Sequence, residues 1–430
     1  MFCYNEKLFA PYVQTSADNV LDLDMVYKNL KQKYFILGFI NIYKNQPEWS
    51  YYYYSKYDKY FESIRSKGGD IIVSFGGADG NEIAVATEDE DIVYENYKSI
   101  IERYKLKWID LDIEGDVLKV KNANKLRNNA LKKIKEEYPE LIISYTLPVT
   151  PHGLNKESLE LLCDARDKGV KIDLVNIMCM DYGSYYAPDP DYNMGYYAKL
   201  CTIKTKENLD SIGLNNTNIG ITVMIGKNDV KDEVFTTYDA TYLLRWARKI
   251  DYVKLMSYWS LNRDNGKGEG KPCSCNWSSI RQEDFEFCKY FQSFNYYENL
   301  ALNKEIKCSS MEDNDMERFN PKYAIDGDPE TRWASKEFEK DEEWIEIDLL
   351  NEYFVDEVLI NWEAAYAKKF NVYISKDGEN YICIYSCKDN NRLYNRFQIK
   401  PILCRYIKVQ CIEKATQYGF SIYEIEVYNK

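Results

Sequence analysis

The sequence predicts an α/β protein made of a (β/α)8 TIM barrel followed by an all-β sandwich. Two observations lead to this prediction. Up to about residue 296, eight short apolar runs alternate with longer amphipathic stretches. After about residue 300, short strand-like runs are separated by turn sequences, and no long helical pattern appears. A doubly wound open sheet is the alternative for the first part, although such a sheet usually has fewer strands.

The strand-like runs of the first part are short and apolar, as expected for strands buried in a parallel sheet. Between several of them, as at 91–106 and 123–138, apolar residues recur at three- and four-residue steps, which predicts helices. Eight strands with intervening helices match a closed parallel barrel. In order, the runs are LFAPYVQT (8–15), YFILGFINI (34–42), IIVSFG (71–76), KWIDLDIE (107–114), LIISYTLPV (141–149), LVNIMCMDY (174–182), NIGITVMIG (218–226) and YVKLMSYWSL (252–261).

The second part has the pattern of an antiparallel sandwich of about 125 residues. Turn sequences such as IDGDPE (325–330) and SKDGEN (375–380) separate its strand-like runs. We therefore expect two domains, at 1–297 and 305–430, joined by a short link. The runs are WIEIDLL (344–350), VDEVLINWE (355–363), KFNVYIS (369–375), RYIKVQ (405–410) and IYEIEVY (422–428).

The composition excludes several classes of function. A formal net charge of −13 argues against nucleic-acid binding, which needs a basic surface, and suits a neutral polymer as partner. No apolar run is long enough to predict a transmembrane segment. His152 is the only histidine, which excludes machinery built on two or more histidines and argues against catalytic zinc. We expect a monomer whose catalysis needs no cofactor.

Cysteine content and the N-terminal segment bear on the compartment. Twelve cysteines in 430 residues are too few for a disulfide scaffold, and their pairing stays open. The segment MFCYNEKLFAPYVQTS has neither the basic nor the apolar region of a signal peptide. We expect a secreted or cell-surface protein, whose signal was removed or which is exported by another route.

Three acids occupy alternate positions in the fourth run: Asp110, Asp112 and Glu114. Alternate residues of a strand share a face, so the three carboxyl groups lie together while the aliphatic residues between them face the other way. A solvated edge strand is the simpler alternative. In a covered strand, the mutual repulsion of the acids raises at least one pKa, as a general acid requires.

The acidic run lies where barrels carry their active sites, at the carboxyl end of a strand. It resembles the fourth strand of glycoside hydrolase family 18 chitinases, D-G-x-D-x-D-x-E, although Lys107 and Trp108 replace the first Asp-Gly. The resemblance covers roughly the first 296 residues. SFGG (74–77) in the third run resembles the family's S-x-G-G. Four further segments resemble the bacterial branch of the family, in the same order: LPVTPHGL (147–154), MCMDYG (178–183), MIGKND (224–229) and YWSLNRD (258–264).

The resemblance implies a substrate-assisted retaining mechanism, the family's exception to the two-carboxylate scheme. Glu114 is expected to protonate the glycosidic oxygen, while the substrate's own acetamido oxygen attacks the anomeric carbon. Asp112 is expected to orient the acetamido group and stabilise its positive charge. Asp110 is expected to share a proton with Asp112.

The resemblance also implies substrate contacts. Trp259 matches the tryptophan on which the −1 sugar stacks, with an ordinary core tryptophan as the alternative. The family's M-x-Y-D reads M-C-M-D at 178–181, so its tyrosine is displaced or absent. Asp181 and Tyr182 are the expected contacts in this segment.

Further residues of the matching segments have supporting or open roles. Ser74 is expected to support Asp110, while Gly76 and Gly77 suit close backbone packing. His152 is expected at the surface or at the rim of a subsite. Either cleft lining or loop capping suits the remaining polar residues, which are Asn228, Asp229 and Asn262–Asp264.

Residues 305–430 resemble a factor V/VIII type C (discoidin-like) domain, as in carbohydrate-binding module family 32. The matching stretches include YAIDGDPETRWAS, EWIEIDLL and GFSIYEIEVY. Such domains often hold a structural calcium ion, and a metal-free turn is the alternative. Trp333 and Trp344 are expected in the core. The implied calcium ligands are Asp326, Asp328, Thr331 and Glu424, with backbone carbonyls near Tyr323 and Tyr423.

Three functions are compatible with this sequence. The first is a retaining endochitinase that hydrolyses β-1,4-linked N-acetylglucosamine polymers and is targeted by its carbohydrate-binding module. The second is an endo-β-N-acetylglucosaminidase that acts on glycoprotein glycans. The third is a non-catalytic chitinase-like lectin, which the presence of Glu114 disfavours. The expected partners are chitin or other N-acetylglucosamine-containing glycans.

Overall fold

The chain consists of two compact units, Met1–Asn295 and Tyr296–Lys430. Each unit is described by itself. The computed structural model describes residues 7–50, 56–78, 81–187, 194–296, 299–337 and 342–428.

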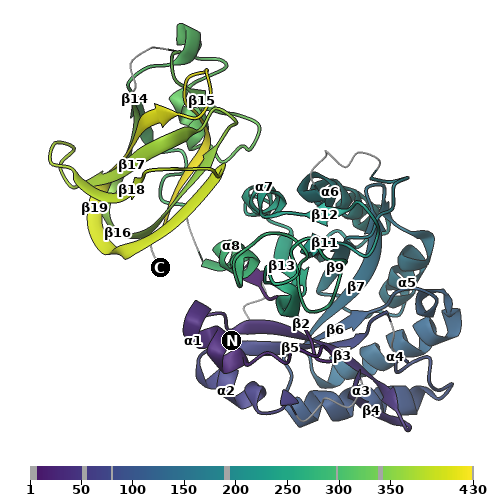
Figure 1. Cartoon of the computed structure of the whole chain (residues 1–430). Coiled ribbons are helices and arrows are strands. Elements are labelled where there is room, and N and C mark those ends of the chain that lie inside the picture. Colours follow the sequence, from purple (N-terminus) through teal and green to yellow (C-terminus); the bar gives the residue numbers. More distant parts are fainter. Residues whose placement is uncertain are drawn as a thin grey trace. The chain divides into compact units, whose positions relative to one another are not determined.

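The first unit is built on a parallel β-barrel, which confirms the predicted fold class (Figure 1). Each of the eight predicted runs supplies a strand, and the sheet order runs β1-β13-β10-β9-β7-β6-β5-β3-β2. The strands are β1 (Leu8–Phe9), β2 (Tyr12–Gln14), β3 (Tyr34–Tyr43), β5 (Asp70–Gly76), β6 (Trp108–Asp112), β7 (Ile142–Thr150), β9 (Leu174–Cys179), β10 (Asn218–Met224) and β13 (Val253–Trp259). Short strands outside the barrel ring are β4 (Gln46–Trp49), β8 (Gly153–Leu154), β11 (Gly226–Lys227) and β12 (Val234–Phe235).

The first predicted run forms two strands, and this split closes the barrel. β1 pairs with β13, whereas β2 pairs with β3 on the other side. Pro11 stands between them and has no N–H to donate to a ladder. Its carbonyl accepts a hydrogen bond from the N–H of Ile36 at 3.0 Å. The run 8–15 therefore joins the last strand of the barrel to the second.

Helices cover the outside of the barrel (Figure 1). The patterns at 91–106 and 123–138 form α3 (Glu90–Tyr104) and α4 (Lys121–Glu137), with boundaries shifted by one or two residues. No helix in the described ranges is long and apolar enough to cross a membrane. The remaining α-helices are α1 (Leu23–Leu30), α2 (Tyr60–Ser66), α5 (Lys156–Asp167), α6 (Met194–Ser211), α7 (Thr237–Ala247), α8 (Glu286–Phe291) and α9 (Ser293–Tyr296).

Apolar and aromatic residues fill the barrel interior near the amino ends of the strands. Trp108 belongs to this cluster, together with Ile36, Ile72 and Leu255. Polar side chains occupy the layers above it, toward the carboxyl ends of the strands. Since all ring strands are parallel, those carboxyl ends meet at one rim, which is where a barrel of this kind carries its functional groups.

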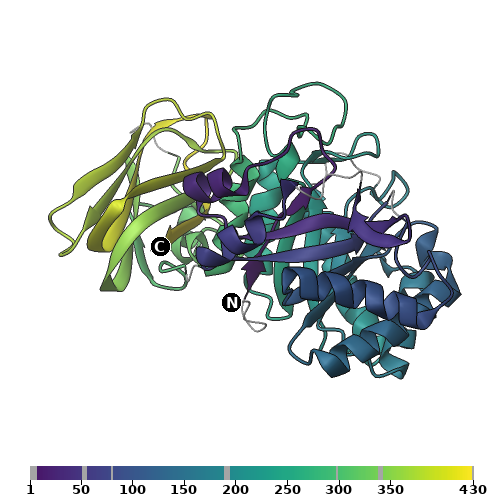
Figure 2. The ribbon, with the colours of Figure 1, turned by 90° about the horizontal axis from the view of Figure 1, so that it is seen from below.

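The second unit is an antiparallel sandwich with strand order β15-β20-β16-β19-β17-β18 and β14 beside β16. Figure 2 shows its green to yellow strands from below. Two predicted runs, 344–350 and 355–363, merge into the single strand β16, whose register shifts between Asp348 and Tyr353. Its strands are β14 (Glu305–Cys308), β15 (Trp333–Ala334), β16 (Glu343–Trp362), β17 (Ala367–Ser375), β18 (Ile382–Cys387), β19 (Tyr394–Lys414) and β20 (Ser421–Tyr428).

The two tryptophans expected in the core of this unit have different environments. Trp333 is fully buried. Trp344 is only partly buried, so the expectation was wrong for this residue. Ile345 and Ile347 of β16 face the core, which turns Trp344 to the outer face because side chains alternate along a strand. There the ammonium of Lys408 lies 4.3 Å from the centroid of its ring.

Candidate active site

Asp110 lies in the middle of the barrel and is held by side chains from three other strands. It is 1% exposed. Its Oδ2 accepts hydrogen bonds from Tyr12 at 2.8 Å and from Ser74 at 2.7 Å. Its Oδ1 accepts from Ser144 at 2.6 Å and from Thr146 at 2.9 Å. The support from Ser74 agrees with the sequence analysis, whereas the other three donors were not identified there.

Burial and hydrogen bonding shift the pKa of Asp110 in opposite directions. Desolvation of the buried carboxyl group raises its pKa above the ordinary aspartate value. Donation from Ser144, Ser74, Tyr12 and Thr146 lowers the pKa in return, because each hydroxyl stabilises the ionised form. The environment therefore offsets part of the cost of placing a carboxylate inside the barrel.

Asp112 occupies the layer above Asp110 on the same strand and is 5% exposed. Its pKa is raised well above the ordinary aspartate value, first by burial and then by the negative charges of Glu114 and Asp110. Within the described residues, its Oδ1 has no hydrogen-bond partner. Asp112 therefore retains its proton to a higher pH than an exposed aspartate.

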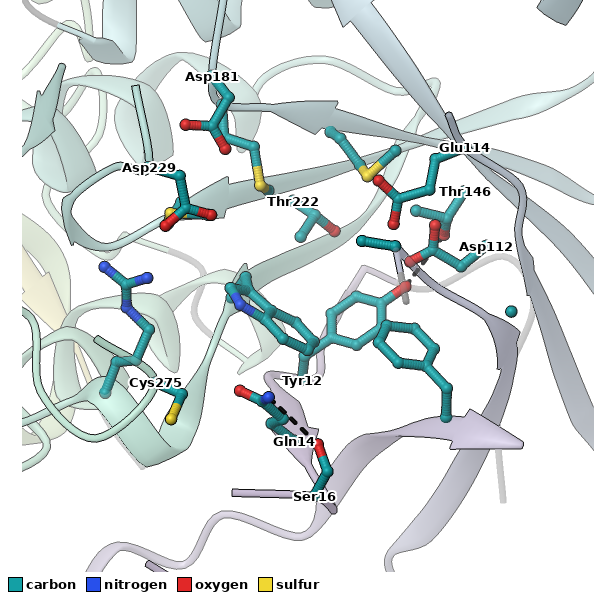
Figure 3. A pocket seen from close by; sticks show the side chains of 18 of the residues that line it. Tyr12, Gln14, Ser16, Asp112, Glu114, Thr146, Asp181, Thr222, Asp229 and Cys275 are labelled. Atoms are coloured by element: carbon teal, nitrogen blue, oxygen red, sulfur yellow. Dashed lines mark hydrogen bonds between the residues drawn. The ribbon is translucent and has the colours of Figure 1, made fainter. Parts of the chain in front are cut away.

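Glu114 lies beyond the strand, which corrects the expectation that the three acids share it. β6 ends at Asp112, and Gly115 adopts a left-handed conformation with φ 58°. The N–H of Ile113 still bonds to the carbonyl of Thr146 at 3.0 Å, so the chain leaves the barrel only at Glu114. Glu114 is partly exposed, and its carboxyl group is turned toward that of Asp112 (Figure 3).

The acids face a cavity of about 310 Å³ at the carboxyl rim of the barrel. Trp259 lines it and stacks on Phe39, with 5.5 Å between ring centroids and 20° between planes. Asp112, Glu114 and Thr146 gather at one end of the cavity, and Asp229 and Cys275 lie apart from them (Figure 3). Other lining residues are Tyr12, Gln14, Asn41, Met178, Met180, Asp181, Thr222 and Arg263.

Tight backbone packing places β5 against the acids. Gly76 has φ 101°, and a Cβ atom there would lie 2.2 Å from the carbonyl oxygen of Asp112. The N–H of Gly77 donates to that same carbonyl at 3.0 Å. Only glycine fits position 76, which agrees with the packing role expected for both residues.

The segment after β9 separates the two contacts that the sequence analysis placed there. Asp181 lines the cavity, and its carboxylate accepts the N–H of Val230 at 2.8 Å. Tyr182 is buried, with its ring centroid 6.1 Å from that of Tyr197 on α6. Asp181 adopts φ 52°, which redirects the chain after the strand. Tyr182 does not line the cavity with Trp259, but it lines the adjoining cavity that shares Glu114, whereas Met180 and Asp181 line both.

Of the loop residues for which the sequence analysis left cleft lining or loop capping open, some line the cavity and others cap their loops. Asp229 and Arg263 line the cavity. Asn228 caps its own loop by donating to the carbonyls of Met224 and Gly226. Asn262 accepts the N–H of Gln14, and Asp264 accepts backbone N–H groups at the start of α8. A clear signal for the missed residues would have been polar side chains within apolar runs, as at Tyr12, Thr146, Asn176 and Thr222.

A second cavity of about 620 Å³ adjoins the first and shares Glu114 with it. His152 lines it and is exposed, as expected for a residue at the rim. Its ring meets that of Tyr186 edge to face at 5.7 Å, and Tyr186 meets Tyr185 in the same way at 4.9 Å. Tyr185 is 81% exposed. Glu114 thus stands between a cavity with Trp259 and one with exposed aromatic rings.

The predicted calcium ligands lie at one edge of the second unit. The hydroxyl of Thr331 and the N–H of Asp328 both donate to Asp326 at 2.8 Å. Glu424 lies on β20, the strand that pairs with β15 at Trp333 and Ala334. This all-oxygen set suits calcium. No group of three carboxylates, histidines or cysteines in the described chain is arranged to hold a metal, so calcium stays a prediction.

Two family models match this sequence. Glycosyl hydrolases family 18 matches residues 9–227, and the F5/8 type C domain matches residues 305–425. The first match contains the acids of β6 and its following loop. The second covers nearly all of the antiparallel unit.

Relatives and solved structures agree with the first match. "Probable bifunctional chitinase/lysozyme" of Escherichia coli (strain K12) is 32% identical over 60% of this chain and 31% of its own length. "Endochitinase 11" of Metarhizium anisopliae is 31% identical over 60% of this chain and 53% of its own length. This chain thus spans about a third and about half of these two relatives. The catalytic domain of the hyperthermophilic chitinase from Pyrococcus furiosus aligns with a TM-score of 0.60 and 28% identity, over 68% of this chain and 97% of that domain.

Proposed function

Because the chain belongs to glycosyl hydrolases family 18, we propose that its first unit is a retaining endochitinase that cleaves β-1,4-linked N-acetylglucosamine polymers. One observation carries the proposal. Glu114 stands partly exposed over the buried Asp112, whose pKa is raised, in a cavity lined by Trp259. An exposed acid, a buried acid behind it and an aromatic ring provide what acid-catalysed cleavage of a sugar polymer needs.

In the proposed reaction, Glu114 donates a proton to the glycosidic oxygen, and the bond between that oxygen and the anomeric carbon breaks. The acetamido oxygen of the same sugar forms a new bond to the anomeric carbon, which gives a cyclic oxazolinium ion. Asp112 accepts the acetamido N–H and stabilises the positive charge. Glu114 then takes a proton from water, which attacks the anomeric carbon and restores the acetamido group with retained configuration.

The sequence analysis expected Asp110 and Asp112 to share one proton, but their environments favour one of the two as its holder. Asp110 accepts hydrogen bonds from four hydroxyl groups, on both of its oxygens. Those donors favour its ionised form, so the proton of the pair resides mainly on Asp112. We propose that Asp110 acts as a fixed negative charge beneath Asp112 and supports the cation that forms above it.

The two cavities give the proposal its endo-acting character. The cavity with Trp259 takes the sugar whose acetamido group reacts, and the cavity with His152 and Tyr186 takes the leaving group. Glu114 borders both, as the proton donor to the bond between them must. We propose that both cavities admit further sugars beyond these two, so that a chain is cut within its length rather than only at its end.

The test compares products from soluble chitin oligosaccharides with glycan release from an N-glycoprotein. We expect cleavage of the oligosaccharides, β-anomers as the first products, and inhibition by a thiazoline analogue of the oxazolinium ion. Glu114→Gln should fold and lose at least a hundredfold in activity, since general acid catalysis is typically worth about 10²–10⁴. Glu136→Gln, at an exposed position on α4, is the matched control and should keep full activity.

Three outcomes would overturn parts of the proposal. Release from the glycoprotein without oligosaccharide cleavage would indicate an endo-β-N-acetylglucosaminidase. Binding without any cleavage would indicate a lectin. A trapped covalent bond between a sugar and Glu114 or Asp112 would replace the substrate-assisted route by an enzyme nucleophile.

We further propose that the second unit targets the enzyme to insoluble or surface-bound glycan, and that the protein acts outside the cell, where such polymers lie. The match to the F5/8 type C domain over residues 305–425 supports a separate module. A chain that ends at residue 300 should keep its activity on soluble oligosaccharides and lose it mainly on insoluble chitin, because targeting raises local concentration only. Equal loss on both substrates would show instead that the second unit shapes the active site.

A further inference from the structure

Trp108 is one of the two residues at which the acidic run departs from its family pattern, and it contacts the residues around Asp110. It is 4% exposed and lies in the apolar cluster near the amino ends of the barrel strands. On β6 it stands two residues before Asp110, so both side chains point into the barrel. Its indole Nε1–H donates to Ser144 Oγ on β7 across 2.9 Å. Ser144 in turn contacts Asp110 at 2.6 Å.

The direction of these two bonds follows from the number of protons. An indole N–H can only donate, so Ser144 must accept from Trp108. A serine hydroxyl has one proton and two acceptor lone pairs, and in the structure its proton is donated to Asp110 Oδ1 at 2.6 Å. By occupying one acceptor site of Ser144, Trp108 favours this orientation, in which Ser144 is a donor to Asp110.

A parallel arrangement acts from the other side of the carboxyl group. The amide of Asn176 on β9 donates to Thr146 Oγ1 at 2.9 Å, and Thr146 donates to Asp110. Asn176 is itself fixed, because its oxygen accepts the hydroxyl proton of Thr222 at 2.9 Å. In both arrangements, a hydroxyl group donates its hydrogen bond to Asp110. A protonated Asp110 would force one of these hydroxyls to turn.

We propose that Trp108 is a positioning residue for catalysis: by orienting Ser144, it holds Asp110 in its ionised form, so that a negative charge remains beneath Asp112. The link to catalysis rests on the proposed function. Among the described residues that contact Asp110 or carry a charge next to it, the titratable groups are Tyr12 from β2 and Asp112 from its own strand. Its other neighbours on β5 and β7 are hydroxyl groups, which do not titrate in the working range.

The sign of the effect on stability follows from linkage. Burial already places the pKa of folded Asp110 above that of the unfolded chain. Loss of a donor raises the folded pKa further, so the variant loses additional stability as the pH rises through that pKa. A packing defect that leaves the pKa of Asp110 unchanged lowers the free energy of unfolding by the same amount at every pH. The cost of a variant at pH 8 compared with pH 4 therefore separates the two explanations.

The experiment measures the free energy of unfolding from pH 4 to pH 8 for the full-length wild type, Trp108→Phe, Ser144→Ala and the double variant. We expect the cost of Trp108→Phe and of Ser144→Ala to grow with pH. The pKa of Asp110 should rise in both variants, because each removes or weakens a hydrogen bond that favours the ionised carboxylate. The pH-dependent part should be no larger in the double variant than in Ser144→Ala, because Trp108 acts through Ser144.

The matched control is Trp333→Phe. Trp333 is fully buried in the second unit, and its N–H donates to the backbone carbonyl of Ser310 at 3.1 Å, which does not titrate. This variant should lose stability by the same amount at every pH. The acid limb of kcat/KM should move to higher pH in Trp108→Phe and Ser144→Ala, and stay in place in Trp333→Phe.

A pH-independent cost of both Trp108→Phe and Ser144→Ala, or additive pH-dependent effects in the double variant, would overturn the proposal. If Trp108→Phe does not fold, Ser144→Ala and Ser144→Thr test the same contact from its other end. The first should show the pH-dependent cost, and the second, which keeps the hydroxyl, should not. Failure of the wild type to cleave chitin oligosaccharides would remove the proposed function and leave the unfolding curves to decide this inference.

Discussion

The hydroxyl of Tyr12 on β2 donates to Asp110 on β6 across 2.8 Å, although 98 residues separate them in the chain. The same ring lies 5.8 Å from that of Trp259, centroid to centroid. Tyr12 thus connects the buried acid to the aromatic wall of the cavity. Its position follows from the split of the first run at Pro11, which places β2 inside the closed barrel.

We predict that Tyr12→Phe lowers kcat by roughly ten- to a hundredfold with little change in KM. The variant keeps the ring and loses one hydrogen bond to a charged group, which is worth about 1.5–3 kcal/mol. Steady-state kinetics on chitin oligosaccharides measure it. The control is Tyr97→Phe, at a buried tyrosine whose hydroxyl donates to Glu82 outside the barrel. It should lose stability and keep kcat, and a similar kcat loss in both variants would contradict the assignment.

The aromatic rings of the second cavity lead to a prediction on substrate length. Tyr186→Ala should raise KM for long oligosaccharides by about two- to tenfold, since an aromatic contact contributes roughly 0.5–1.5 kcal/mol. It should leave unchanged the hydrolysis of a substrate whose leaving group is a small phenol, because that group is too short to contact Tyr186. Tyr238→Ala, at an exposed tyrosine on α7, is the control. Equal changes with both substrates would mean that the cavity does not hold the leaving group.

The buried position of Asp264 leads to a prediction on the pH dependence of stability that does not involve catalysis. Burial raises its pKa to about 6, although Tyr258 and the backbone N–H groups of Phe287 and Cys288 donate to it. Because the folded pKa lies above the unfolded value, its contribution to stability is complete below about pH 4 and decreases as the pH rises toward 6. The decrease is at most ~3 kcal/mol.

Asp264→Asn should remove this slope. Relative to the wild type, the free energy of unfolding of the variant should increase between pH 4 and pH 6, whatever the absolute cost of the substitution. Chemical denaturation at a series of pH values measures the difference. An unchanged slope would show that Asp264 does not titrate in this range.

The calcium prediction is tested on the full-length protein by thermal unfolding in calcium and in EDTA. We expect calcium to raise the Tm of the second unit, since a ligand that binds only the folded state stabilises it. Asp326→Asn should abolish the rise. Asp377→Asn removes an aspartate from another turn of the same unit and should keep it. A rise that survives Asp326→Asn would place the ion elsewhere, and the absence of a rise in the wild type would remove the calcium site.

Local patterns were sufficient to predict the fold class and the main acids. The eight apolar runs and the spacing of Asp110, Asp112 and Glu114 depend on residues close in sequence, and strand periodicity translates such spacing directly into facing side chains. The same local rules failed where the chain changes direction. The end of β6 before Glu114 is one example, and the left-handed Asp181, after which Tyr182 lines the second cavity and not the one with Trp259, is another.

The sequence by itself determined the two architectures, the carboxylate chemistry and the acidic run, because hydrophobic periodicity and residue type are properties of short segments. Only the tertiary structure decided which other hydroxyl groups join Ser74 around Asp110. Tyr12, Ser144 and Thr146 come from two strands far apart in the chain, and the barrel register brings them to one carboxyl group. Such contacts depend on closure of the whole barrel, and the pKa of a buried acid depends on those contacts more than on its own neighbours in sequence.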